Sequence, residues 1–185
     1  MSDLTGKNAL IIIPRSQFCE EELYGVRSAL GNKGVRVVVL SKSGKEARGM
    51  KQDEFQPDGM IVDWDRQPGV QGKYHVVVLI GGKGARKSLW DDPIVPQILT
   101  DHHRFGSVIG AMGSALVVLV RASLATGEIP LPKDADTQKE LEILNAVCVD
   151  ASVTRVDNII LGQSADSVDH FSQQILHLID NEDVE

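Results

Sequence analysis

The chain has 185 residues, enough to bury about 70% of its unfolded surface around one core, so we expect a single domain over residues 1–185. A formal net charge of -7 at pH 7 opposes binding to the phosphate backbone of nucleic acids, because Lys and Arg form no dense run that would override it. Residues 1–8 lack the apolar core of a secretion signal and no apolar stretch approaches the ~20 residues of a membrane helix, so we expect a soluble protein without a membrane partner. Cys19 and Cys148 form no CxxC pair and suggest no disulfide framework, so we expect a cytoplasmic protein.

Strand and helix patterns alternate along the chain. Near-continuous apolar runs predict strands that are covered on both faces, as in parallel sheets. In chain order these runs occupy residues 9–13, 35–40, 75–80 and 107–111. Apolar residues at helical spacing predict amphipathic helices over residues 20–33, 93–105 and 171–179.

Two weaker extended stretches, residues 47–50 and 60–63, predict a small side hairpin. Right-handed crossovers between parallel strands place helices on both faces of the sheet. The alternation therefore predicts an α/β three-layer sandwich with a mostly parallel sheet. Sheets of this kind bind ligands beyond the carboxyl ends of their strands.

Three junctions follow predicted strands, and we expect them to converge on one pocket. They occupy residues 14–23, 81–85 and 112–113. The last belongs to a sharp strand-turn-helix segment, which points one side chain into a pocket. We place Met112 at this elbow. A thioether has no ionisable proton, so Met112 cannot act as a nucleophile.

An acidic turn, a strand that ends in Gly-Gly, the elbow and two later segments follow one another in a characteristic order. These motifs occupy residues 18–23, 74–82, 108–113, 147–150 and 159–162. In this order and spacing the chain resembles the ThiJ/PfpI superfamily, whose flavodoxin-like fold is shared with class I glutamine amidotransferase domains. The resemblance implies a flavodoxin-like three-layer sandwich and a homodimer.

The resemblance also implies a set of site residues. Family members carry a cysteine at the elbow, the position assigned to Met112, and Glu22 matches the carboxylate that bonds to this cysteine. Gly82 and Gly113 match the positions whose backbone N–H groups form an oxyanion hole. The expected pocket-lining residues are Cys19, Gly81, Gly82, Met112 and Gly113.

The chain departs from the family pattern in three places. Residues 113–115 differ from the usual sequence after the elbow, residues 128–132 lack the histidine or other polar partner, and residues 162–164 lack an arginine. All three departures lie in segments that would serve a cysteine nucleophile. We interpret them as a loss of cysteine chemistry.

Each candidate residue has a structural and a functional interpretation. Met112 could be a flexible apolar filler or a wall of a ligand pocket. Glu22 could be solvated at a helix start, or buried, in which case desolvation would raise its pKa. Cys19, one helical turn before Glu22, could be a substitute thiol or an inert cysteine. Ser114 is expected to point along its helix, with no histidine placed to activate it.

No cofactor or metal is expected. No two of the five histidines stand four residues apart with a third ligand nearby, and we assign surface positions to His102 and His103. The glycines of residues 81–85 lack the spacing of a phosphate-binding loop. A small molecule is therefore the expected ligand.

Two functions remain open. The first is a non-catalytic protein with a binding, regulatory or assembly role. The second is a hydrolase, hydratase or lyase of small carbonyl or nitrile-like compounds, in which Glu22 acts as general acid or base on water. If the oxyanion hole is intact, Met112→Cys is expected to give a thiol whose pKa is lowered by the helix N-terminus.

Overall fold

The computed structural model describes residues 2–181, so residues 1 and 182–185 of the expected domain lie outside the described part. A seven-stranded sheet forms its centre, in the order β10-β11-β7-β6-β1-β2-β5. The parallel strands are β1 (Asn8–Ile12), β2 (Arg36–Ser41), β5 (Gly59–Met60), β6 (Val76–Leu79), β7 (Val108–Met112) and β11 (Ile159–Gly162). Only the edge strand β10 (Val153–Val156) runs antiparallel to its neighbour within the described sheet.

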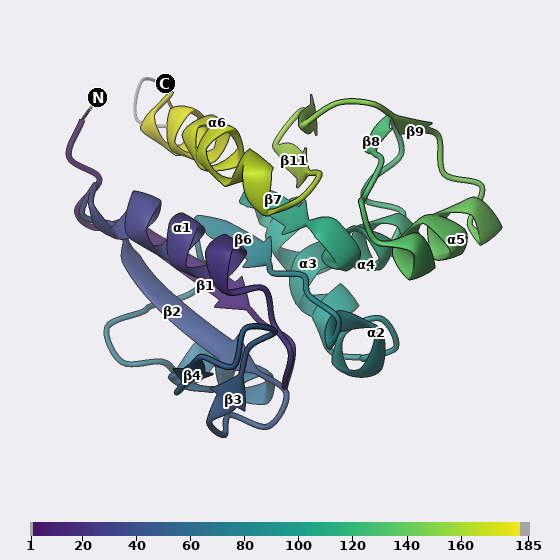
Figure 1. Cartoon of the computed structure of the whole chain (residues 1–185). Coiled ribbons are helices and arrows are strands. Elements are labelled where there is room, and N and C mark those ends of the chain that lie inside the picture. Colours follow the sequence, from purple (N-terminus) through teal and green to yellow (C-terminus); the bar gives the residue numbers. More distant parts are fainter. Residues whose placement is uncertain (1, 182–185) are drawn as a thin grey trace.

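Helices cover both faces of this sheet, which confirms the predicted α/β three-layer fold (Figure 1). One face carries α1 (Glu20–Gly31) and α6 (Val168–Asn181). The other face carries α3 (Val95–Phe105), α4 (Leu116–Arg121) and the 3-10 segment η1 (Ile61–Arg66), and α5 (Ala135–Ile143) packs against α4. Short elements connect these layers: α2 (Ala85–Ser88), η2 (Gly113–Ala115), η3 (Ala165–Ser167), β8 (Ile129–Pro130) and β9 (Cys148–Val149).

The strand β1 shows why the apolar runs are nearly continuous. Leu10 and Ile12 belong to the core under α3 and α4, whereas Ala9 and Ile11 belong to the core under α1 and α6. Successive side chains of a strand point to opposite faces, so a strand that is covered on both faces needs apolar residues at every position. None of the helices in residues 2–181 combines the length and apolar character needed to cross a membrane.

The side hairpin forms, but the predicted pairing of its strands is wrong. β3 (Ala47–Arg48) pairs with β4 (Glu54–Phe55). Of the second predicted stretch, only Met60 lies in a strand, β5 at the edge of the main sheet, and residues 61–63 belong to the 3-10 segment η1. The buried carboxylate of Glu20 accepts hydrogen bonds from the backbone N–H groups of Lys51 (2.7 Å) and Asp53 (3.3 Å). This contact closes the turn after β3 early, so β4 follows within a few residues.

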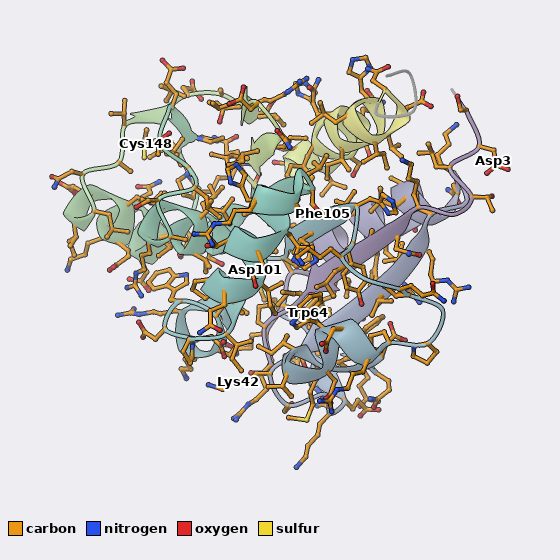
Figure 2. All side chains as sticks on the ribbon, turned by 180° about the vertical axis from the view of Figure 1, so that it is seen from behind. Asp3, Lys42, Trp64, Asp101, Phe105 and Cys148 are labelled. Atoms are coloured by element: carbon orange, nitrogen blue, oxygen red, sulfur yellow. The ribbon has the colours of Figure 1, made fainter. Side chains whose placement is uncertain are left out.

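His102 is fully buried, which corrects its expected surface position. Its Nδ1 lies 2.7 Å from the carbonyl oxygen of Ile98, and its ring packs edge-on against Trp64 of η1 at a centroid distance of 5.0 Å. Figure 2 shows Asp101 of α3 and Trp64 on the same side of the molecule. Burial lowers the pKa of His102 because the protonated ring loses its hydration. His102 is buried because α3 packs onto η1. The local sequence pattern does not predict this packing.

Gly25 allows α1 and α6 to approach each other, and we expect Gly25→Ala to destabilise the protein. A Cβ at Gly25 would lie 2.2 Å from Val168 Cγ1, so the Val168 side chain must leave its position or the two helices must move apart. Gly31, in the same helix, has no atom within 4 Å of such a Cβ. Gly31→Ala is therefore the control, with a gain of up to about 1 kcal/mol from helix propensity. Urea unfolding of both variants measures the effect, and equal stabilisation by the two changes would contradict the close contact.

Candidate functional site

A cavity of about 300 Å³ lies beyond the carboxyl ends of β1, β6 and β7. The three expected junctions meet there, together with segments from the hairpin and from the loops before α5 and η3. Of the five residues expected to line the pocket, Cys19, Gly82 and Gly113 do so. Gly81 and Met112 do not lie on the cavity wall. The parallel arrangement of the strands explains the convergence, because it brings their carboxyl ends to the same edge of the sheet.

Met112 belongs to the hydrophobic core and not to the pocket, which corrects its predicted position. Its side chain is fully buried in the cluster that includes Ile160 and Phe171. A Cβ at Gly162 would lie 2.9 Å from Met112 Cε and 3.1 Å from Phe171 Cδ2, so the thioether fills the space between β11 and α6. The backbone of Met112 is ordinary extended strand, with φ -129° and ψ 145°. These features are those of an apolar filler.

Gly113 occupies the elbow. It is the first residue after β7, and its φ of +54° lies in the left-handed region that favours glycine. A Cβ at Gly113 would lie 2.9 Å from Glu22 Oε1. A side chain at this position would therefore point at the carboxyl group of Glu22, which is the geometry expected of the elbow residue. The glycine in the Met-Gly-Ser sequence was the available signal, because a sharp turn with positive φ favours glycine over methionine.

Glu22 is buried and lines the cavity, with 3% of its surface exposed. Its Oε2 accepts a hydrogen bond of 2.8 Å from the backbone N–H of Gly81. Burial raises the pKa of Glu22 to about 7, because desolvation outweighs the opposing effect of the Gly81 bond. Of the two interpretations of Glu22, the structure supports the buried carboxyl. Near neutral pH the group exchanges a proton and can act as either donor or acceptor.

Ser114 reaches the pocket, contrary to the expectation that it points along its helix. Its Oγ accepts a hydrogen bond from the Gly82 N–H (3.0 Å) and donates one to the Gly82 carbonyl oxygen (2.7 Å). The Gly82 N–H, expected to contribute to an oxyanion hole, is therefore already bonded. Ser114 would have to rotate away before this donor could bind a ligand.

The thiol of Cys19 faces the cavity but is poorly suited to react. Burial, with a further contribution from the charge of Glu22, raises the pKa of Cys19 to about 12. Its Sγ also lies 3.5 Å from Glu21 Oε2. A thiol with so high a pKa is almost entirely protonated at neutral pH, and the thiolate is the reactive form.

The side walls of the cavity come from the hairpin turn and from the two later segments, residues 128–132 and 162–164, where the sequence departs from the family pattern. Met50 of the hairpin turn and Pro132, before α5, face it from two sides. At its margins Lys51 pairs with Glu21, and Lys133 pairs with Asp166. The polar residues Lys133, Asp134, Gln163 and Ser164 complete the lining on the α5 and η3 sides. The positions of such loops depend on tertiary contacts, which one sequence pattern does not reveal.

The site offers proton exchange and hydrogen bonding. Among residues 2–181 no group of three His, Cys, Asp or Glu side chains is arranged to hold a metal ion. The reactive group on the cavity wall is the buried carboxyl of Glu22, with cationic and polar side chains around the opening.

Comparison with known proteins identifies similar sequences. A model of the DJ-1/PfpI family matches residues 7–178. An uncharacterized protein of Methanocaldococcus jannaschii is 26% identical over 180 residues, which cover 94% of this chain and 84% of the relative. The protein dj-1beta of Drosophila melanogaster is 28% identical over 124 residues, which cover 66% of this chain and 63% of the relative.

Solved structures show the same fold. A ThiJ/PfpI domain protein from Brachyspira murdochii aligns with a TM-score of 0.82 at 19% identity, covering 95% of this chain and 99% of the other. The structure of Drosophila melanogaster DJ-1beta aligns with a TM-score of 0.78 at 24% identity, covering 97% of this chain and 91% of the other. At these identities the likeness establishes the flavodoxin-like α/β architecture.

Proposed function

Since the chain belongs to the DJ-1/PfpI family, we propose that it binds a small molecule in the pocket beside Glu22, without nucleophilic catalysis by a cysteine. The observation that carries this proposal is the position of the Glu22 carboxyl group, where a side chain at position 113 would point. The elbow has no side chain, and the space next to it is taken by the carboxyl oxygen Oε1 of Glu22. Neither Met112, buried in the core, nor Cys19, with its raised pKa, replaces the missing nucleophile.

Glu22 is the polar group on which we expect the ligand to depend. Its Oε2 is held by the Gly81 N–H, so its orientation is fixed. Its Oε1 lies on the side of Gly113, where no side chain of the elbow covers it. When protonated, Glu22 can donate a hydrogen bond to a carbonyl, amide or hydroxyl oxygen of a ligand. The ligand would thus present an uncharged acceptor at this end of the pocket.

Acid-base catalysis is the second candidate, and one observation favours it. A general acid or base is most effective when its pKa lies near the working pH, and that of Glu22 is raised to about 7. Water would be the nucleophile. This reaction needs a second group to stabilise the developing charge, and the Gly82 N–H that could do so is bonded to Ser114.

Turnover measurements separate the two candidates. We expect the purified protein to convert glyoxal, a peptide substrate and a simple amide no faster than buffer, because no activated nucleophile faces the cavity. Glu22→Gln should behave identically in these assays. A rate well above buffer that disappears in Glu22→Gln would contradict the binding proposal and favour the acid-base candidate. Glu21→Gln, which changes an exposed carboxylate at the margin of the same cavity, is the matched control, because it shows whether an effect belongs to Glu22 or to any carboxylate there.

A further inference from the structure

A second cavity, of about 230 Å³, adjoins the pocket. The two cavities share the lining residues Gly82, Lys83, Ser114 and Asp134, so they lie side by side, and we call the two together the cleft. The cleft runs from Glu22, past Ser114, to the side chains that follow β6. Its wall there is Trp90, which is buried and fixed by a 2.7 Å hydrogen bond from its Nε1 to the Ser114 carbonyl oxygen.

The far end of this cleft is cationic. Lys83, Arg86 and Lys87 line the second cavity, whereas the acidic residues that line it are Asp134 and Asp136. Three positive charges therefore face two negative ones, in a protein whose net charge is -7. The overall charge makes a local excess of cations at a cavity notable, because it is opposed by the field of the whole molecule.

Both acidic side chains are already engaged. Asp134 caps α5, where its Oδ2 accepts a 3.0 Å hydrogen bond from the Thr137 N–H. Asp136 lies 3.4 Å from Arg86 Nη1. Among residues 2–181, neither Lys83 nor Lys87 has a carboxylate within ion-pair distance. Two exposed ammonium groups are thus available to an anion, that of Lys83 where the two cavities meet and that of Lys87 in the second cavity.

We propose that the second cavity, with Lys83 and Lys87 on its wall, is a subsite for an anionic group, a phosphate or a carboxylate. The ligand would be a small elongated molecule, with this anion at one end and an uncharged oxygen acceptor at the Glu22 end. The Glu22 end rests on the proposed function, and the anionic subsite rests on the charges of the second cavity alone. Ammonium groups bind either anion through charge-assisted hydrogen bonds.

Titration of the ¹⁵N-labelled protein at constant ionic strength tests the subsite. The probes are inorganic phosphate, glycerol 3-phosphate, glycerate and glycerol, followed through the amide signals of Lys83 and Gly113. We expect the phosphate ester or the carboxylate to bind at least roughly tenfold more tightly than glycerol. The relative affinities of glycerol 3-phosphate and glycerate distinguish the two anions. Equal affinity of glycerol and both anionic probes would overturn the subsite.

The variant Lys83→Ala/Lys87→Ala should lose this preference, because both ammonium groups are removed. Lys45→Ala/Arg104→Ala removes two exposed positive charges elsewhere and should retain it. An equal loss in both variants would show only a general charge effect and would reject the subsite. Inorganic phosphate does not need Glu22, so its binding should persist in Glu22→Gln. Turnover that depends on Glu22 would therefore contradict the proposed non-catalytic function. It would leave the binding of phosphate at the anionic subsite unaffected.

Discussion

A cysteine at position 113 is expected to react with iodoacetamide, whereas a cysteine at position 112 is expected to stay protected. The variants Gly113→Cys and Met112→Cys are compared in a Cys19→Ser/Cys148→Ser background, which removes both native thiols. The Cβ at position 113 points to Glu22 at the cavity wall, but the side chain at position 112 lies in the core. Labelling of a buried thiol requires local opening, so we expect a rate difference on the order of 100-fold.

A reactive thiol was expected from Met112→Cys. The structure places the elbow one residue later, so we now expect the reactive thiol from Gly113→Cys. Gly113→Ala is the control for the backbone, because any side chain at φ +54° costs about 1–2 kcal/mol and must displace Glu22 Oε1 slightly. Mass spectrometry of the labelled proteins over time gives both rates. Faster labelling at position 112 than at position 113 would show that Met112 is the elbow residue.

Glu22→Gln is expected to stabilise the protein above pH 7 and to flatten the dependence of its stability on pH. The folded-state pKa of Glu22 is about 7, compared with the ordinary value of 4.5. Between these values the unfolded chain has lost the proton that the folded protein still holds, so the free energy of unfolding falls as pH rises. The full decrease is about 3 kcal/mol and is complete just above pH 7. The glutamine side chain would avoid this decrease because its amide does not ionise. Its oxygen can still accept the hydrogen bond from the Gly81 N–H.

Urea unfolding at pH 4.5, 6 and 8 tests this prediction. The quantity compared is the free energy of unfolding of the wild type and of Glu22→Gln. The difference should grow in favour of the variant as pH rises. Glu21→Gln serves as the control, because Glu21 is half-exposed and pairs with Lys51, which lowers its pKa. A wild-type-to-variant difference that stays constant across these pH values would mean that Glu22 is ionised in the folded protein like any exposed carboxylate.

Much of the fold follows from local patterns. The strands β1, β6 and β7 occupy apolar runs that the sequence displays directly, because both faces of the sheet are covered. The helix α5 is not among the predicted helices, although Asp134 provides an N-cap signal there. The predicted pairing of the hairpin strands is wrong, because the observed pairing depends on Glu20, which lies far from the hairpin in the sequence. Local periodicity predicts elements, whereas partners distant in the chain decide how short elements pair.

In the candidate site, too, some features follow from the sequence and others only from tertiary packing. Residue identities alone establish that the chain has no cysteine near the end of β7 and that Glu22 stands at the start of a helix. That Gly113, and not Met112, faces Glu22 emerges from the packing of the folded chain. Neighbouring residues at the end of a strand point to opposite sides, so a shift of one residue exchanges pocket for core. Packing of Met112 against Gly162 and Phe171 fixes that register. Contacts of this kind are absent from any local pattern.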